Sequence, residues 1–258
     1  MSIWNLHCNT ALRRSRRQCN LRVCYEVKRW ACHVIEHLSK AEYIFAASAF
    51  FKSYCDIVIS MSKKLLAISS SPRTRGNSDS ALDMFLDAVK DKFEIEKVQL
   101  KSTPFSPCRG CGFCEKDGEC IQKDAFIPLM DKMLECDVLV FASPVYALSV
   151  CAQAKMLIDR CQALWARKFL LKTLSADDNK RGIFIATAGQ TFPDVFEHTV
   201  PVARFLFNVA GVKNKNMQYI LLDGLDKKTD FSKSDKAKEK VLQAALDLAE
   251  KEELTDLN

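Results

Sequence analysis

From Lys64 onward, short apolar runs alternate with segments in which apolar residues recur at helical spacing. The runs predict buried strands, and the 3.6-residue period predicts amphipathic helices. Strands alternating with helices predict a parallel sheet covered on both faces, and five strands suit the order 2-1-3-4-5 of a flavodoxin-like three-layer α/β sandwich. The predicted strands cover residues 64–69, 93–100, 137–143, 181–189 and 217–222; the predicted helices cover residues 77–90, 123–135, 151–168, 195–209 and 235–252, the last with Ser234 as N-cap.

Residues 1–62 differ from this pattern, and we treat them as an extension to a domain at 63–258. They carry nine Lys/Arg against four Asp/Glu, whereas residues 63–258 carry 29 against 28, so the domain itself has no basic footprint for nucleic acid. We favour a reading frame that starts too early, with the true start near Met61, over a helical extension or a transit peptide. His33 and His37 lie one helical turn apart, but without a third ligand we interpret them as surface residues.

Composition narrows the class of protein. Hydrophobic residues make up 48% and charged residues 27%, which is typical of a globular chain with a sizeable core. The apolar run Tyr43–Phe51 is far shorter than the roughly 20 residues that a membrane helix needs, so we expect no membrane partner. We see no secretory signal, and we expect a cytoplasmic location with reduced thiols. The twelve cysteines then indicate metal or redox chemistry.

Four cysteines gather in the loop at residues 104–121 with the spacing C-x2-C-x2-C-x5-C. Thiolates at i, i+3 and i+6 are how bacterial ferredoxins bind three irons of a [4Fe–4S] cluster, and the fourth cysteine here completes the set locally. Gly110 and Gly112 supply the unusual backbone dihedrals that such a tight loop requires. The predicted cluster ligands are Cys108, Cys111, Cys114 and Cys120.

Two alternatives to an iron–sulfur cluster remain open. Structural zinc sites with four cysteines usually use two separated C-x2-C pairs, which this spacing does not match well. Free thiols or disulfides in an empty loop are the other alternative. We interpret the separate Cys136, Cys151 and Cys161 as small core hydrophobes.

The loop after the first predicted strand, "SSSPRTRGNS" at 69–78, leads directly into a helix. A helix N-terminus offers free N–H groups to an anion, and in open α/β sheets ligands lie beyond the carboxyl ends of the strands. The loop lacks both glycine-rich nucleotide motifs, so we favour a lone phosphate, such as that of FMN, over an ordinary polar loop. Ser69 and Ser71 would add donors, Arg73 would add charge, and Asn77 and Ser78 are expected to cap the helix and bind an oxyanion together.

Two further loops have the chemistry for a flat heteroaromatic ring. In "SPVYALSV", residues 143–150, we expect Pro144 to fix a turn, and Pro144–Ser149 to offer backbone donors to one edge of the ring and the aromatic Tyr146 to its face. Thr187 and Gly189 in "ATAGQTF", residues 186–192, are expected to approach the other side. The alternative for Tyr146 is that it merely packs against a helix.

These motifs carry a resemblance to a known family. "LLAISSSPRTRGNS", the four cysteines and "DVLVFASPVYALSVCAQAKMLIDR" resemble, in this order, the iron–sulfur flavoproteins within the NADPH-dependent FMN reductase branch of the flavodoxin-like superfamily. The resemblance covers roughly residues 63–225. It implies FMN-phosphate contacts for Ser71, Arg73, Asn77 and Ser78, and a place along the isoalloxazine for Pro144, Val145 and Tyr146. The chain has Ser70 where the family usually has glycine.

We therefore expect an oxidoreductase that uses FMN and a [4Fe–4S] cluster. The cofactors carry the electron chemistry, and with neither a Ser-His-Asp nor a Cys-His arrangement we predict no catalytic side chain. His198 is expected at the surface. Ferredoxin or NAD(P)H would be the electron donor and a small molecule the acceptor. The resemblance implies a homo-oligomer, with the cluster of one subunit near the flavin of another.

Two other functions remain open. One is a plain NAD(P)H-dependent FMN or quinone reductase without a cluster, and the other is a non-enzymatic flavin electron carrier or redox sensor.

Overall fold

The structure is a computed structural model that describes residues 63–255, with side chains through Lys251. The described fold begins at Lys63, the first residue of the first strand. The interpretations of His33, His37 and the start near Met61 lie outside the described residues. None of the helices in residues 63–255 combines the length and apolar character that a membrane span requires.

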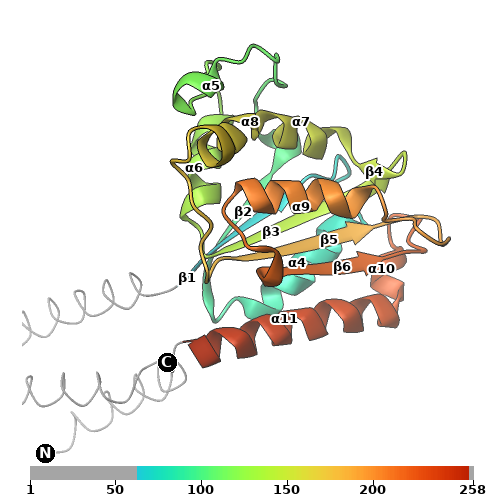
Figure 1. Ribbon diagram of the computed structural model, residues 1–258. Coiled ribbons are helices and arrows are strands. Elements are labelled where there is room, and N and C mark those ends of the chain that lie inside the picture. Colours follow the sequence, from blue (N-terminus) through green and yellow to red (C-terminus); the bar gives the residue numbers. More distant parts are fainter. Residues whose placement is uncertain (1–62, 256–258) are drawn as a thin grey trace, which may run out of the picture. The chain divides into compact units, whose positions relative to one another are not determined.

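A parallel sheet forms the middle layer (Figure 1). The strand order is β2-β1-β3-β5-β6, and every neighbouring pair is parallel, which confirms the predicted order and fold class. A two-residue strand, β4, pairs antiparallel with the end of β3, so the sheet has six strands rather than the predicted five. The strands are β1 (Lys63–Ser69), β2 (Phe93–Gln99), β3 (Val138–Tyr146), β4 (Ser149–Val150), β5 (Arg181–Thr187) and β6 (Met217–Leu222).

Helices cover both faces of the sheet. One face carries α6 (Phe126–Glu135), α7 (Ala152–Arg160), α8 (Gln162–Trp165) and α9 (Thr199–Val209) (Figure 1). The other face carries α4 (Asn77–Val89), α10 (Asp230–Lys233) and α11 (Asp235–Thr255). The shorter elements are α5 (Cys114–Asp117), η1 (Leu100–Ser102), η2 (Ala166–Leu170) and η3 (Asn214–Asn216).

Alternating side chains along each central strand build two separate cores. In β1, Leu66 and Ile68 join the core under α6 to α9, whereas Leu65 and Ala67 join the core under α4 and α11. Both faces are buried, which is why the strands read as continuous apolar runs rather than as an alternating pattern.

Two predicted helices differ most from the observed ones, whereas the helix expected at 123–135 begins at Phe126 and the one expected at 235–252 runs to Thr255. The helix expected at 151–168 is divided into α7, α8 and the π-helical turn η2. The helix expected from residue 195 begins at Thr199, which places Pro201 in the first turn, where its missing N–H costs nothing. Ser234 is confirmed as the N-cap of α11, because its Oγ accepts the N–H of Ala237 at 3.3 Å.

Candidate functional site

The carboxyl ends of β1, β3 and β5 lie side by side, and the three predicted flavin loops meet there. The guanidinium carbon of Arg73 is 5.9 Å from the ring centroid of Tyr146, so the loop after β1 contacts the end of β3. Thr187 donates a hydrogen bond to Ser78 Oγ at 3.2 Å, which joins the end of β5 to the start of α4. The structure therefore places these four predicted site residues around one edge of the sheet.

The N-terminus of α4 lacks a side-chain cap. Its N-cap is Gly76, so the prediction that Asn77 and Ser78 cap this helix is wrong. The first N–H groups of a helix have no intrahelical partner, and an uncapped terminus leaves them available to an anion. Ser71 shapes the loop before the helix, because its Oγ accepts the N–H of Arg73 at 3.2 Å. Arg73 itself is exposed.

Asn77 holds another segment of the chain. Its Nδ2 donates to the carbonyls of Leu225 and Lys227 at 2.8 and 2.9 Å, and its Oδ1 accepts the N–H of Phe231 at 3.1 Å. Both amide hydrogens are thus engaged, and the side chain fixes the β6–α10 connection against α4. A phosphate contact by this side chain would require those bonds to break.

The first two serines of the same loop face inward. Ser69 donates a hydrogen bond to the buried carboxylate of Asp79, a residue that the sequence did not single out. Ser70 is fully buried and donates to the carbonyl of Ala142 at 2.8 Å, and the Cys151 thiol donates to the Ser70 carbonyl at 3.0 Å. The Ser70 hydroxyl therefore ties β1 to β3 and does not obstruct the loop where the family usually has glycine.

The turn after β3 differs from the prediction. Pro144 to Tyr146 continue the strand, with Pro144 opposite Thr187, so Pro144 does not form the turn. The turn is made by Ala147 and Leu148, which have φ of 48° and 65°. Hairpins with two positive-φ residues usually use Asn or Gly, and such conformations cost about 1–3 kcal/mol each in other residues. Backbone strain of this kind is concentrated at functional sites. The sequence has no glycine at either position that would have predicted the turn.

Other contacts hold this turn and its neighbour. Thr199 Oγ1 donates to the Leu148 carbonyl at 3.3 Å, which links the hairpin to α9. A Cβ on Gly189 would lie 2.8 Å from Oδ1 of the exposed Asp226, so a larger residue would displace this carboxylate, and glycine lets the β6–α10 connection pass closely. Contact of Gly189 with a bound ring stays a prediction. His198 is exposed, as expected.

The cysteine loop leaves η1, includes α5, and returns to α6. Figure 1 shows α5 beyond α8, at the far end of α7 from the β3–β4 hairpin. Gly110 and Gly112 have φ of 64° and 67°, which confirms that they supply left-handed dihedrals. Burial raises the pKa of the Cys114 thiol, and the charges of Cys108, Cys120 and Cys111 raise it further. Cys108 and Cys111 are exposed, whereas Cys114 and Cys120 are half-buried.

Within residues 63–251, no three His, Cys, Asp or Glu side chains are arranged to hold a metal ion. The four cysteines and the backbone around them nevertheless have the chemistry to bind an iron–sulfur cluster. The thiols are free, and the Gly110 N–H donates to Cys108 Sγ at 3.4 Å. Backbone N–H groups directed at sulfur are among the hydrogen bonds that tune iron–sulfur centres.

Two arginines anchor this loop, and the sequence reasoning missed both. Arg160, at the end of α7, binds the Ser106 carbonyl at 2.7 Å and the Asp124 carboxylate at 2.8 and 3.0 Å, so it joins the two ends of the loop. Arg167, in η2, donates to the Gly118 carbonyl at 2.9 Å. A lone arginine in a helix gives no sequence signal for such a role, because the residues that these arginines hold lie 36 to 54 positions earlier in the chain.

The three remaining described cysteines are buried, as predicted for core hydrophobes. Burial raises the pKa of Cys136 and Cys161 above the usual thiol range, which keeps both protonated and unreactive.

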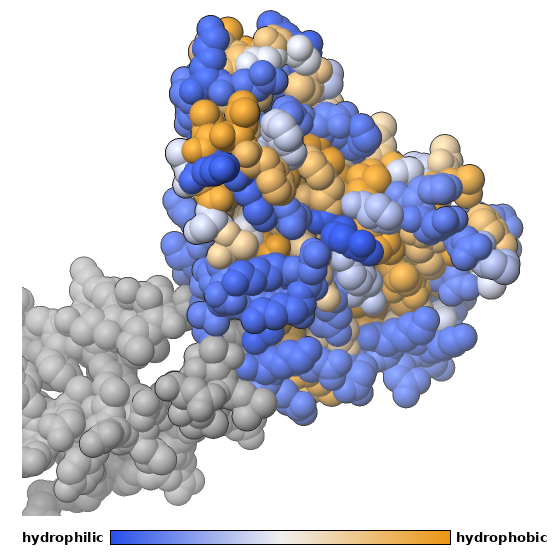
Figure 2. Space-filling model, in the orientation of Figure 1, coloured by the Kyte–Doolittle hydropathy of each residue, from blue (hydrophilic) through white to orange (hydrophobic). Residues whose placement is uncertain are grey.

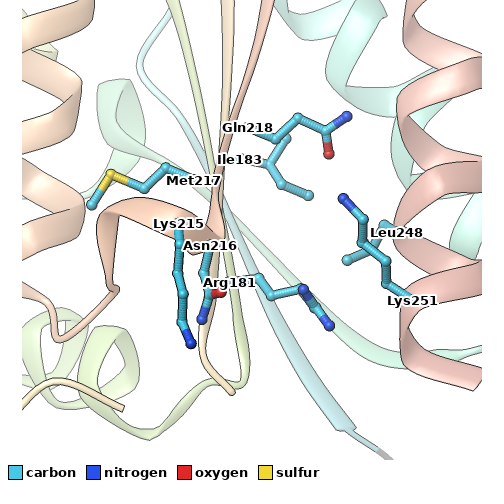
Figure 3. Close-up of a pocket in the computed structure, with 8 residues that line it drawn as sticks. All are labelled: Arg181, Ile183, Lys215, Asn216, Met217, Gln218, Leu248 and Lys251. Carbon is cyan, nitrogen blue, oxygen red and sulfur yellow. The ribbon is translucent and has the colours of Figure 1, made fainter. Parts of the chain in front are cut away.

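A small cavity lies at the opposite edge of the sheet (Figure 3). It is formed by the amino ends of β5 and β6 together with the last turns of α11, whereas ligands of open α/β sheets bind at the carboxyl ends. We therefore place the candidate site elsewhere. The lining residues are Arg181, Ile183, Lys215, Asn216, Met217, Gln218, Leu248 and Lys251.

Comparison with solved structures supports the fold. An azoreductase from Bacillus anthracis aligns with a TM-score of 0.55 and 17% identity, covering 73% of this chain and 99% of that chain. An NAD(P)H:quinone oxidoreductase from Methanothermobacter marburgensis aligns with a TM-score of 0.52 and 17% identity, covering 71% and 94%. At this identity the likeness concerns the fold alone.

Sequence relatives are closer. An "Iron-sulfur flavoprotein" from Archaeoglobus fulgidus is 43% identical over 98 residues, which are 38% of this chain and 44% of that protein. One from Methanosarcina thermophila is 32% identical over 127 residues, or 49% and 63% of the two chains. The chain thus matches about half the length of these relatives. The model of the NADPH-dependent FMN reductase family matches residues 63–207, which include all three strand-end loops and the cysteine loop, and the chain belongs to this family.

Proposed function

We propose that this protein is an FMN-dependent oxidoreductase that also holds a [4Fe–4S] cluster, and that it passes electrons from NAD(P)H or ferredoxin to a small-molecule acceptor. The observation that supports the flavin site best is the meeting of three loops at the carboxyl ends of β1, β3 and β5 through the Arg73–Tyr146 and Thr187–Ser78 contacts. A related fold, an FMN-dependent NADH-azoreductase from Bacillus anthracis, is known in complex with FMN.

The phosphate of FMN would bind at the uncapped N-terminus of α4. There the backbone N–H groups, the Ser71 and Ser78 hydroxyls and the Arg73 side chain offer hydrogen bonds and positive charge. The ring would lie against Pro144, Val145 and Tyr146, where the strained turn at Ala147 and Leu148 fixes the backbone in advance. Thr187 and Gly189 remain the proposed contacts on its other side.

The cluster would be held by the four cysteines of the loop. When bound, FMN exchanges one or two electrons and an iron–sulfur cluster exchanges one, so the pair would convert two-electron into one-electron transfer. In one chain, α7 separates the two sites: its nine residues rise about 1.5 Å each, or about 13.5 Å in all. The protein would contribute by holding the two cofactors in loops at opposite ends of this helix.

A homo-oligomer remains part of the proposal. Apolar side chains surround α8 and lie beside α9 on the face shown in Figure 2. In η2, which follows α8, Phe169 and Leu170 are about half exposed, and Phe205 on α9 is also exposed. Association of subunits would bury such side chains. Light scattering on the purified protein measures its mass and therefore tests whether it is a homo-oligomer.

Two alternatives share the flavin site. A plain FMN or quinone reductase would have the same fold with an empty cysteine loop, and analysis of bound iron distinguishes it. A non-enzymatic carrier would bind FMN but would not oxidise NAD(P)H steadily when a quinone is supplied as acceptor.

Replacing Arg73 with alanine tests the phosphate site. We expect FMN to bind more weakly by about 1–3 kcal/mol, because a charged hydrogen bond to the phosphate is lost. Riboflavin, which lacks the phosphate, should bind the variant and the wild type almost equally. Fluorescence titration measures both affinities, and an equal loss for riboflavin would show that Arg73 does not contact the phosphate. Arg75→Ala, in the same exposed loop, is the matched control.

A further inference from the structure

Arg160 is unusual among the charged residues of the described chain. The residue is only 1% exposed, and its side chain stacks on Phe126 with the guanidinium carbon 4.5 Å from the ring centroid. The two Nη atoms are satisfied by the Ser106 and Gln122 carbonyls and by the Asp124 carboxylate. These partners stand at the two ends of the segment that contains the four cysteines. The guanidinium therefore closes that segment at its base.

The third nitrogen of the same group has no partner. Among the residues that the structure describes, Arg160 Nε is the one buried side-chain nitrogen or oxygen without a hydrogen bond. Leaving such a donor unpaired in the interior costs about 1–3 kcal/mol, so native proteins seldom tolerate it without a function or a missing partner. The unpaired N–H calls for an acceptor next to the cysteine loop.

Cys120 is the candidate for that acceptor. It lies two residues before Gln122, whose carbonyl accepts a hydrogen bond from Arg160 Nη2 at 3.1 Å. Its side chain packs against the core cluster that includes Phe126, the ring on which the guanidinium stacks. A neutral thiol is a weak acceptor, whereas a thiolate bound to iron is a strong one. The orphaned donor therefore fits a loop whose Cys120 is a metal ligand better than a loop of free thiols.

We propose that Arg160 is a positioning residue for the cluster, with its Nη atoms fixing the loop ends and its Nε–H donating to the sulfur of Cys120. This inference rests on the proposed iron–sulfur site and extends it. Hydrogen bonds to the sulfurs help to set the reduction potential of an iron–sulfur cluster, and loss of such outer contacts typically lowers metal affinity about 10–100-fold.

Arg160→Lys is the principal test, in the full-length protein purified without oxygen. Lysine keeps the charge but cannot bind both loop ends and Cys120 together. We expect FMN to remain bound, iron to be released to a chelator about 10–100-fold faster, and the cluster potential to become more negative. Lys155→Gln, on an exposed position of the same helix, should leave both quantities unchanged.

The variant Arg167→Lys distinguishes two possible roles of Arg160: positioning the Cys120 sulfur and anchoring the loop. Arg167 holds Gly118 and Glu119 without an unpaired buried nitrogen, so its loss should speed iron release but leave the potential as in the wild type. An equal change of potential in both variants would mean that loop anchoring alone is responsible, and the inference would fail.

A measurement on the wild type does not depend on whether the variant folds. When arginine is labelled with ¹⁵N at Nε, pulsed electron paramagnetic resonance of the reduced protein should show a coupling between the cluster and a ¹⁵N nucleus. The coupling should persist in Arg109→Gln, which removes the arginine next to Cys108. Absence of the coupling, or a wild-type potential in Arg160→Lys, overturns this inference while the cluster stands. Absence of iron from the wild type overturns the cluster and this inference together.

Discussion

Replacing Cys111 with serine should remove nearly all iron and acid-labile sulfide from the protein while FMN stays bound. Cys111 is the middle residue of the tight C-x2-C-x2-C part of the loop, and a cluster that loses such a ligand is not held by the remaining thiols. The flavin loops follow β1, β3 and β5, so they do not depend on this segment. Metal analysis, sulfide determination and flavin release measure the three quantities on one sample.

The remaining cysteines provide graded controls for this experiment. Cys108→Ser and Cys114→Ser should behave like Cys111→Ser. Cys120→Ser is expected to keep some iron, because the three closely spaced cysteines before the longer gap can still hold a three-iron cluster. Serine in place of the buried Cys136, Cys151 or Cys161 should leave the iron content unchanged. Full iron in Cys111→Ser would remove this cysteine from the ligand set and contradict the proposed site.

Asp124→Ala should lower the free energy of unfolding by about 3–5 kcal/mol, because it leaves a fully buried guanidinium without its counter-ion. The Arg160 side chain has no exposed surface in this ion pair, and Asp124 receives two of its hydrogen bonds. Asp159→Ala removes the exposed Lys155–Asp159 pair of the same helix and should cost no more than about 1 kcal/mol. Urea denaturation of the FMN-free proteins measures both changes.

The same ion pair predicts how stability depends on pH. Burial raises the pKa of Asp124, but hydrogen bonds from Arg160 and from the backbone of Ser106 and Phe126 outweigh it, so its pKa in the folded state is lowered. The stabilisation is therefore fully present above the unfolded value of about 3.9 and is lost as the pH falls through the folded pKa. Asp124→Ala should weaken the acid dependence of stability below about pH 4. An unchanged pH profile would mean that the carboxylate is not stabilised by the fold.

The sheet was predictable because its strands are buried on both faces and read as continuous apolar runs. The strand β4 was not predictable, because two residues carry no period, and the turn before it uses Ala147 and Leu148 in a conformation that usually selects glycine or asparagine. The segment 151–168 keeps a helical pattern of apolar residues into the π-helical turn at Ala166–Leu170, so no change in the pattern indicates the interruption.

The candidate site was also predictable only in part. Loop chemistry predicted that Arg73, Tyr146, Ser78 and Thr187 come together, because parallel strands bring their carboxyl ends to one edge, and the Arg73–Tyr146 and Thr187–Ser78 contacts confirm this placement. Their role in binding FMN stays a prediction. Asn77 was assigned to a phosphate, but its amide is engaged by backbone that follows almost 150 residues later. Arg160 was missed for the same reason, since its partners lie in a distant loop and only tertiary structure brings them together.

The most direct test of the proposed function is the cofactor content of the full-length protein purified without oxygen. We predict FMN together with iron and sulfide in the ratio of one [4Fe–4S] cluster per chain, and a visible spectrum in which a broad absorbance underlies the sharper flavin bands. Reduction should bleach both components. Flavin with zinc, or flavin with no metal at all, would contradict the cluster and leave a plain flavin reductase with a structural cysteine loop.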